Sequence, residues 1–171
     1  MILREILDRY SVRSYSSVEI PENDLNEILE SARLAPSACN IQPWKFIVVK
    51  NQRIKDELSI ACKNQKFVAQ ASVVIAGCLI EAEAYKMSKR YDSGALDLGI
   101  ALTNMTLQAV NLGLGSCWIG AFYEDQVQKV LKIPEDIRVV ALLTIGYPKE
   151  TGIPKKIRKE LSEIVCIDEY K

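Results

Sequence analysis

The sequence predicts an α+β fold in which helices surround one central mixed β-sheet. Three apolar runs rich in β-branched residues have the composition of strands, and they lie at residues 44–50, 72–78 and 139–147. Between them, apolar residues recur at three- and four-residue spacing, as in amphipathic helices. The 171 residues contain no repeat and no linker, so we expect a single domain over residues 1–171.

The expected helices have recognisable starts. The second begins with Pro21, which suits a first helical position. The third begins at Asn51 and has an Asn or Gln cap region. The helices are expected at residues 1–9, 21–35, 51–61, 98–112 and 125–131. Two further segments complete the chain: a charged, helix-like insertion at residues 81–90 and an edge strand at residues 164–167.

An uncharged stretch at residues 98–123 is the most distinctive part of the sequence. Its first half is apolar on nearly every face, which indicates a helix buried on all sides, in a core or between subunits. Gly113-Leu114-Gly115 ends this helix, because glycine readily adopts the left-handed cap, and a short strand follows at residues 116–120. The stretch is long enough for a membrane span. Polar residues interrupt it, however, so we expect no membrane association.

The composition excludes several classes of function. Lys and Arg total 22 and Asp and Glu total 22, so no basic field favours nucleic acid. The absence of histidine removes the commonest general base and the usual zinc ligand. The five cysteines form no C-x-x-C pair and the N-terminus lacks a signal-peptide pattern, so we expect no metal site and a cytoplasmic location. If the chain is an enzyme, its chemistry resides in a bound cofactor.

Two segments contain candidate binding residues. Arg9, Ser11 and Arg13 combine two guanidinium groups with a hydroxyl, which suits a phosphate. A solvated basic turn gives the same pattern, since surface arginines are common. The proline-fixed loop at residues 35–44 contains Ser, Asn and Gln side chains that suit a ligand contact; the alternative is a plain connection between a helix and a strand.

Together, three motifs resemble those of the FMN-dependent nitroreductase family, over almost the whole chain. They are Arg9-x-Ser11-x-Arg13, Ala35-Pro36-Ser37-x-x-Asn40-x-Gln42-Pro43-Trp44 and Gly113-Leu114-Gly115-Ser116-Cys117-Trp118-Ile119-Gly120. The resemblance implies a compact member of the family that forms an intertwined homodimer, with FMN at the subunit interface. In such a dimer the uncharged helix packs against its mate, so we expect a charge at Met105 to disrupt dimerisation.

The resemblance also implies cofactor contacts, residue by residue. The FMN phosphate would be held by Arg9 and Ser11, with Lys156 and Arg158 from the tail, while Tyr10 stands where the family often has a second arginine. Arg13 matches a cation near the pyrimidine edge of the isoalloxazine. The remaining matches fall into three groups. The resemblance implies contact with the flavin of the other subunit for Pro36, Ser37, Ala38 and Asn40. It implies contact with the flavin for Asn64, Gln65 and Lys66, and a position along one flavin face for Trp118, Ile119 and Gly120.

The implied reaction is a two-step exchange at one site. NADH or NADPH passes hydride to flavin N5 and leaves, and a small electron acceptor such as a nitroaromatic or a quinone is then reduced. Because the flavin supplies the chemistry, no catalytic side chain is expected. Two alternatives stay open: a flavoprotein of this fold with a protein donor or a specialised acceptor, and a non-catalytic dimer that binds flavin or another phosphorylated ligand.

Overall fold

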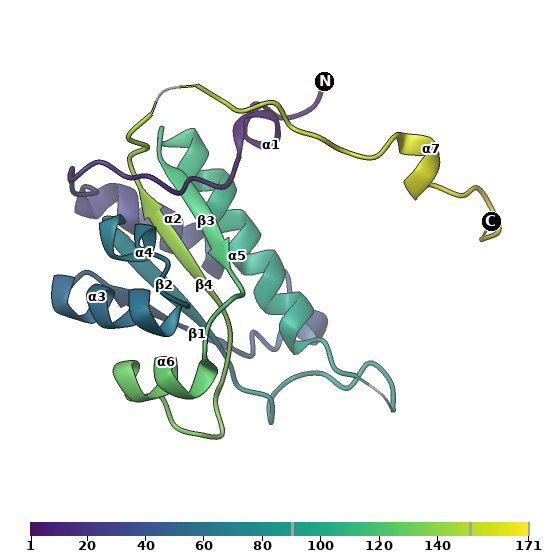
Figure 1. Ribbon diagram of the computed structural model, residues 1–171. Coiled ribbons are helices and arrows are strands. Elements are labelled where there is room, and N and C mark those ends of the chain that lie inside the picture. The colour runs from purple at the N-terminus through teal and green to yellow at the C-terminus, as the bar shows by residue number, and fades with distance from the viewer. Residues whose placement is uncertain (90, 151, 171) are drawn as a thin grey trace.

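The computed structural model describes residues 1–89, 91–150 and 152–170, and it contains a four-stranded sheet between two layers of helices (Figure 1). The elements in chain order are α1 (Arg4–Asp8), α2 (Glu22–Arg33), the 3-10 turn η1 (Ala38–Asn40), β1 (Trp44–Val49), α3 (Gln52–Ala61), α4 (Phe67–Gln70), β2 (Val73–Leu79), α5 (Gly94–Asn111), β3 (Gly115–Ile119), α6 (Glu124–Leu131), β4 (Arg138–Gly146) and α7 (Leu161–Ile164).

The sheet has the strand order β1-β2-β4-β3, and its strands pair only with antiparallel neighbours. The α+β class is therefore confirmed, but the expected mixing of strand directions within the sheet is not. An isolated parallel bridge joins Ser11 of the N-terminal segment to Ser116 of β3. Through this bridge the N-terminal segment lies along β3, at one edge of the sheet.

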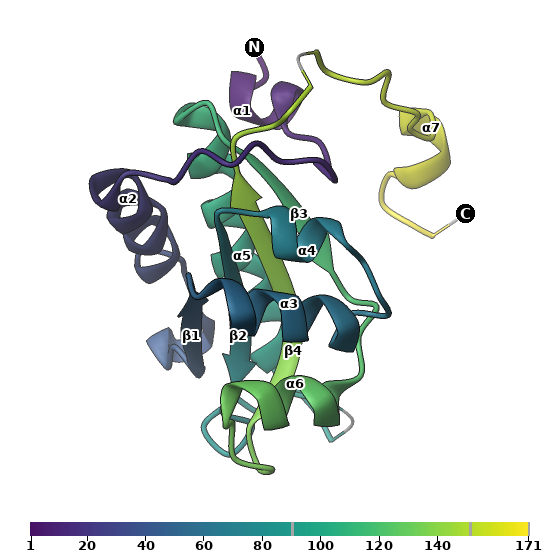
Figure 2. The same cartoon turned by 60° about the vertical axis from the view of Figure 1, so that its left-hand side comes forward.

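Both faces of the sheet are covered, which explains the continuous apolar runs of its strands. Every residue of β2 is buried, and its side chains alternate between two cores. One core lies under α3, α4 and α6, and the other lies under α2 and α5. Figure 2 shows α3, α4 and α6 in front of the sheet and α5 behind it.

Helix α5 has one face buried within its own protomer and one face exposed there. Leu98, Leu102 and Met105 are fully buried against the sheet of the same protomer, whereas Leu96 on the opposite face is 57% exposed. The proposed charge at Met105 would therefore disrupt the protomer's own core, and that expectation about the dimer was wrong. Because nearly every position of the helix is apolar, its sequence periodicity does not distinguish the two faces.

Two other expectations need correction. Residues 81–89 form turns rather than a helix, and a bridge between Lys86 and Asp92 closes them into a hairpin-like loop; Arg90 lies outside the described residues. Residues 164–167 form no strand in the protomer. Ile164 is the last residue of α7, residues 165–167 follow it, and the tail extends away from the sheet (Figures 1 and 2).

The helix ends agree with the sequence signals. The Asn51 side chain accepts a hydrogen bond from the backbone N–H of Ile54 at 3.2 Å, so it caps α3. Gly113 has a φ of +74°, the left-handed conformation that ends α5. Within the described part of the chain, no helix is both long and apolar enough to cross a membrane.

Candidate functional site

The N-terminal segment reaches the site because it lies directly against β3. The backbone N–H of Val12 donates to the Ser116 carbonyl oxygen at 3.0 Å. A Cβ on Gly115 would lie 2.4 Å from Val12 Cγ2, which is closer than any side chain tolerates. Glycine at this position therefore permits the close approach that brings residues 9–13 beside the strand.

Tyr15 anchors the same segment to β4. Its phenolic oxygen lies 2.8 Å from Thr144 Oγ1, and the hydroxyl donates to the Val12 carbonyl oxygen at 3.0 Å. Burial raises the pKa of Tyr15 above its usual range, so the phenol remains neutral and keeps its proton for hydrogen bonding. The buried phenol thus fixes the position of the residues that precede it.

Arg9, Ser11 and Arg13 all act on the Cys117 thiol of β3. Burial raises the pKa of this thiol, and the positive charges of Arg13 and Arg9 oppose that rise, as does a hydrogen bond with the Ser11 side chain. Among the described residues, neither arginine is paired with a carboxylate. Two cations without anionic partners, beside a hydroxyl, form a site that suits an anion.

A side-chain amide joins the loop at residues 63–66 to the end of β3. The Gln65 side-chain nitrogen donates to the Cys62 carbonyl oxygen at 2.8 Å and to the Ala121 carbonyl oxygen at 3.1 Å. Both N–H groups are thereby used, so the Gln65 oxygen is the atom that remains for a ligand. Asn64, in a left-handed conformation, and Lys66 are exposed beside it.

The residues at the end of β3 differ in what they can offer a ligand. Ile119 is 2% exposed, so its side chain belongs to the core and only its backbone is available. Trp118 is 38% exposed and lies beside the outer face of α5. Gly120 is exposed, and a Cβ there would meet no atom within 4 Å. Neither packing nor a positive φ in the protomer requires this glycine, which leaves open space for a ligand at its backbone.

The predicted loop contacts lie elsewhere, beside the first turn of α5. The Ala38 backbone N–H donates to Asp97 Oδ1 at 3.1 Å, and the Gln42 backbone N–H donates to Ser37 Oγ at 3.0 Å. Pro36 and Asn40 are exposed on the same loop. The structure thus holds these four predicted residues together, as a second group built on α5.

The two cations of the tail have different positions. The Lys156 ammonium donates to the Ile6 carbonyl oxygen at 3.4 Å and to the Leu7 carbonyl oxygen, at the end of α1 and two residues before Arg9. The Arg158 guanidinium donates to the carbonyl oxygen of its neighbour Ile157 at 2.7 Å. In the protomer, Lys156 therefore accompanies the N-terminal segment, while Arg158 extends with the tail.

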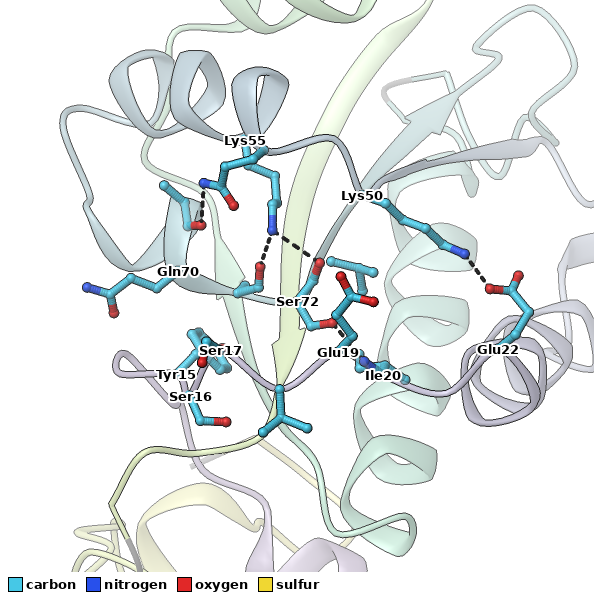
Figure 3. Close-up of a pocket in the computed structure, with 15 residues that line it drawn as sticks. Tyr15, Ser16, Ser17, Glu19, Ile20, Glu22, Lys50, Lys55, Gln70 and Ser72 are labelled. Atoms are coloured by element: carbon cyan, nitrogen blue, oxygen red, sulfur yellow. Dashed lines mark hydrogen bonds and ion pairs between the residues drawn. The ribbon is translucent and has the colours of Figure 1, made fainter.

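A separate cavity of about 480 Å³ lies between the N-terminal residues 15–20 and helices α3 and α4 (Figure 3). The Lys55 ammonium points into it and donates to the carbonyl oxygens of Ala71 at 2.7 Å and Ser72 at 3.3 Å. Burial lowers the pKa of Lys55. This lysine joins α3 to the start of β2, and no predicted cofactor contact lines the cavity.

Two residues near the site were not predicted from the sequence. The Cys117 thiol interacts with Ser11 and with the charges of Arg9 and Arg13, and Asp97 holds the loop beside α5. The sequence position of Asp97 could have indicated its role. It is the last charged residue before the uncharged run, and it lies four residues before Ala101, which places it on the buried side of the helix. A charge on a buried face needs partners, and its partners here come from another loop.

The fold is of the α+β class, and the cationic N-terminal segment lies against β3 at the edge of its sheet. The sequence model of the nitroreductase family matches residues 6–76 and 60–147. A protein of Archaeoglobus fulgidus that carries the provisional name NADH dehydrogenase/NAD(P)H nitroreductase is 38% identical over 153 residues, which cover 86% of each chain. The chain belongs to the nitroreductase family.

Two further relatives extend the comparison. An FMN reductase [NAD(P)H] of Bacillus subtilis is 29% identical over 170 residues, covering 90% of this chain and 68% of the relative. The structure of an FMN-dependent nitroreductase from Clostridium difficile R20291 is similar with a TM-score of 0.84 and 26% identity, and the similarity covers 97% of this chain and 98% of that one.

Proposed function

We propose that this protein is an FMN-dependent oxidoreductase that uses NADH or NADPH to reduce a small electron acceptor, such as a nitroaromatic or a quinone. The observation that carries the proposal is the pair of arginines, Arg9 and Arg13, on a segment that lies against β3 through the bridge between Ser11 and Ser116. Neither arginine has a carboxylate partner among the described residues. The named activities of the relatives support the same class of reaction.

The residues present fit FMN. Arg9, Ser11 and Lys156 would hold the phosphate, because the two cations and the hydroxyl supply charge-assisted hydrogen bonds. Arg13 would stabilise negative charge at the pyrimidine edge of the ring, and the exposed backbone of Gly120 gives the ring a surface that it can approach closely. When bound, FMN supplies hydride transfer, and the protein supplies orientation and electrostatics.

The complete site is proposed to need a second copy of the chain. Apolar side chains are exposed on α1, on the outer face of α5 and along the tail, a larger apolar surface than an isolated protomer normally presents. They include Ile2, Leu3, Ile6, Leu7, Leu96, Ile157, Leu161, Ile164 and Ile167. A tail that extends away from its own protomer can pack against a second protomer, and Arg158 would then reach the partner's site (Figure 1).

The outer face of α5 contains a further indication of close contact. Gly99 costs the helix about 1 kcal/mol relative to alanine, and nothing in the protomer lies within 4 Å of the position of its absent Cβ. Together with Ala95 and Thr103 it forms a surface of small residues beside Leu96 and Ile100. A partner backbone that packs against this face would account for the glycine.

Steady-state kinetics test the proposed reaction. With saturating FMN, rates measured against NADH or NADPH at several quinone concentrations should give parallel double-reciprocal lines, because the two substrates occupy one site in turn. Intersecting lines would contradict the shared site. Flavin binding without turnover would favour a protein donor or a specialised acceptor, and a protein that binds no flavin would exclude the proposed function.

The dimer is tested with two matched variants. Leu96→Asp places a charge on the outer face of α5, where Leu96 is 57% exposed, and should convert the dimer to a folded monomer with weakened FMN binding. Ile60→Asp changes a residue of α3 that is 61% exposed, on the other side of the sheet, and should leave the dimer intact. Light scattering after size exclusion measures both. A stable Leu96→Asp dimer would place the interface elsewhere.

A further inference from the structure

The loop that contains Pro36 to Asn40 has an unusual backbone. Three of its non-glycine residues, Cys39, Asn40 and Gln42, have φ values of +50°, +56° and +57°. Residues with a Cβ rarely adopt this left-handed region. Such conformations persist where the surrounding structure holds them in place, so the loop needs an anchor.

Among the described residues, one side chain outside the loop accepts a hydrogen bond from the loop's backbone. The Ala38 N–H donates to Asp97 Oδ1 at 3.1 Å, across 59 residues of sequence. Two further hydrogen bonds between side chain and backbone stay within the loop, from the Gln42 N–H to Ser37 Oγ and from Gln42 Nε2 to the Asn40 carbonyl oxygen. Asp97 thus connects the left-handed turn to α5.

Asp97 is itself a buried charge with few partners. It is 3% exposed, and its second oxygen accepts a hydrogen bond from the Ser93 hydroxyl at 2.6 Å. No cation among the described residues forms an ion pair with it. Its position in the first turn of α5 favours a negative charge, but a buried carboxylate still requires its hydrogen-bond donors. The buried Asp97 carboxylate therefore needs the Ala38 N–H as a donor, and the loop needs the carboxylate as its anchor.

We propose that Asp97 is a positioning residue for cofactor binding: its carboxylate fixes the loop at residues 36–40 against the first turn of α5 in the conformation that contacts FMN. The identity of the ligand rests on the proposed function above. Since α5 also carries the surface proposed to meet the second copy, Asp97 joins the cofactor loop and the dimer surface into one unit. The residue acts through Ala38 and touches no ligand itself.

Three substitutions separate geometry from charge. Asp97→Ala removes the acceptor, and Asp97→Asn keeps an oxygen of the same reach without the charge. Asp97→Glu keeps the charge but moves the oxygens outward by one methylene. A positioning role predicts that FMN affinity falls about tenfold or more in D97A, which loses a hydrogen bond to a charged group. It also predicts that D97N retains more affinity than D97E.

Two measurements make the test independent of overall stability. The melting temperature and the oligomeric mass of each variant show whether it is folded and associated like the wild type. Hydrogen exchange of the Ala38 amide, followed by NMR on FMN-free protein, reports on the loop directly and should accelerate about tenfold or more in D97A. Asp56→Ala removes a carboxylate on α3 and is the control, which should change neither the exchange rate of the Ala38 amide nor the FMN affinity. If D97A does not fold, the order of D97N and D97E carries the test.

The outcomes are distinct. Unchanged Ala38 exchange and unchanged FMN affinity in D97A, or higher affinity in D97E than in D97N, would overturn the positioning role. A wild-type protein that binds no FMN would overturn the proposed function instead, while the exchange measurement would still test whether Asp97 holds the loop. Coupled loss of Ala38 protection and of FMN affinity, with recovery in D97N, supports the proposal.

Discussion

Replacing Arg9 with methionine should weaken the binding of FMN while leaving the binding of riboflavin unchanged. In the structure Arg9 lies beside Ser11 and Cys117, and no described carboxylate pairs with it, so its charge is available for an anion. Riboflavin has the same ring but no phosphate. The comparison of the two flavins therefore isolates the phosphate contact from every effect on the ring.

The size of the effect follows from the kind of hydrogen bond. A hydrogen bond to a charged group contributes about 1.5–3 kcal/mol. At about 1.4 kcal/mol per factor of ten, the dissociation constant of FMN should rise about 10- to 150-fold. Methionine keeps a long, flexible side chain, so the packing of this half-buried position changes little.

Fluorescence titration of apoprotein with each flavin measures the two affinities. Arg53→Met is the matched control, because Arg53 on α3 is exposed and forms an ion pair with Glu57 at 3.2 Å, in the helical layer on one face of the sheet. The control should bind both flavins normally. Equal weakening of FMN and riboflavin by Arg9→Met, or no weakening of either, would refute the phosphate assignment.

Three further predictions address the site and the core. Gly120→Ala should preserve the melting temperature, since the new Cβ meets no atom within 4 Å, yet reduce flavin affinity in a titration; normal affinity would remove Gly120 from the site. Tyr15→Phe should lower the unfolding free energy by about 1–3 kcal/mol, or the melting temperature by about 2–10 °C, because the Thr144 contact is lost; an unchanged melting curve would contradict the anchoring role. At pH 8 a thiol reagent should modify the two exposed cysteines, and all five after unfolding, because burial raises the pKa of Cys62 to about 12 and of Cys78 to about 11. Because the thiols ionise at lower pH in the unfolded chain than in the folded one, the unfolding free energy should also fall as pH rises above about 9. Rapid modification of all five cysteines in the folded protein would exclude this burial.

Much of the fold could be predicted because local signals agree with the tertiary structure. The apolar run that became β2 is covered on both faces, and the glycine turn that ends α5 has the expected left-handed Gly113. The Asn51 cap of α3 was also predicted, and the structure confirms it. In each case the residues that specify the element lie within it or next to it, which is the information that periodicity and capping rules use.

Other features depend on contacts that periodicity does not describe. An all-apolar helix gives no indication that Met105 faces the sheet and Leu96 faces outward. Residues 164–167 have strand composition, but a strand needs a pairing partner, and these residues pair with no strand in the described part of the chain. The role of Asp97 arises from a hydrogen bond to Ala38, 59 residues away, which only the folded chain brings together.

The site illustrates the same distinction. The motif at residues 9–13 was found in the sequence because its charges are adjacent, and the structure adds that this segment lies against β3, where Ser11 forms a bridge with Ser116. The contribution of each residue to flavin binding remains a prediction. Gln65 was expected to touch the flavin, and the structure adds that its amide nitrogen joins two loops of the site.

The most direct test of the proposed function is the visible absorption spectrum of the FMN-loaded protein under anaerobic conditions, before and after addition of NADH or NADPH. The protein is expected to bind FMN, to lose the oxidised flavin bands with at least one nucleotide much faster than free FMN does, and to regain them when a nitroaromatic or a quinone is added. Flavin bands that persist with both nucleotides, or a protein that binds no FMN, would contradict the proposal.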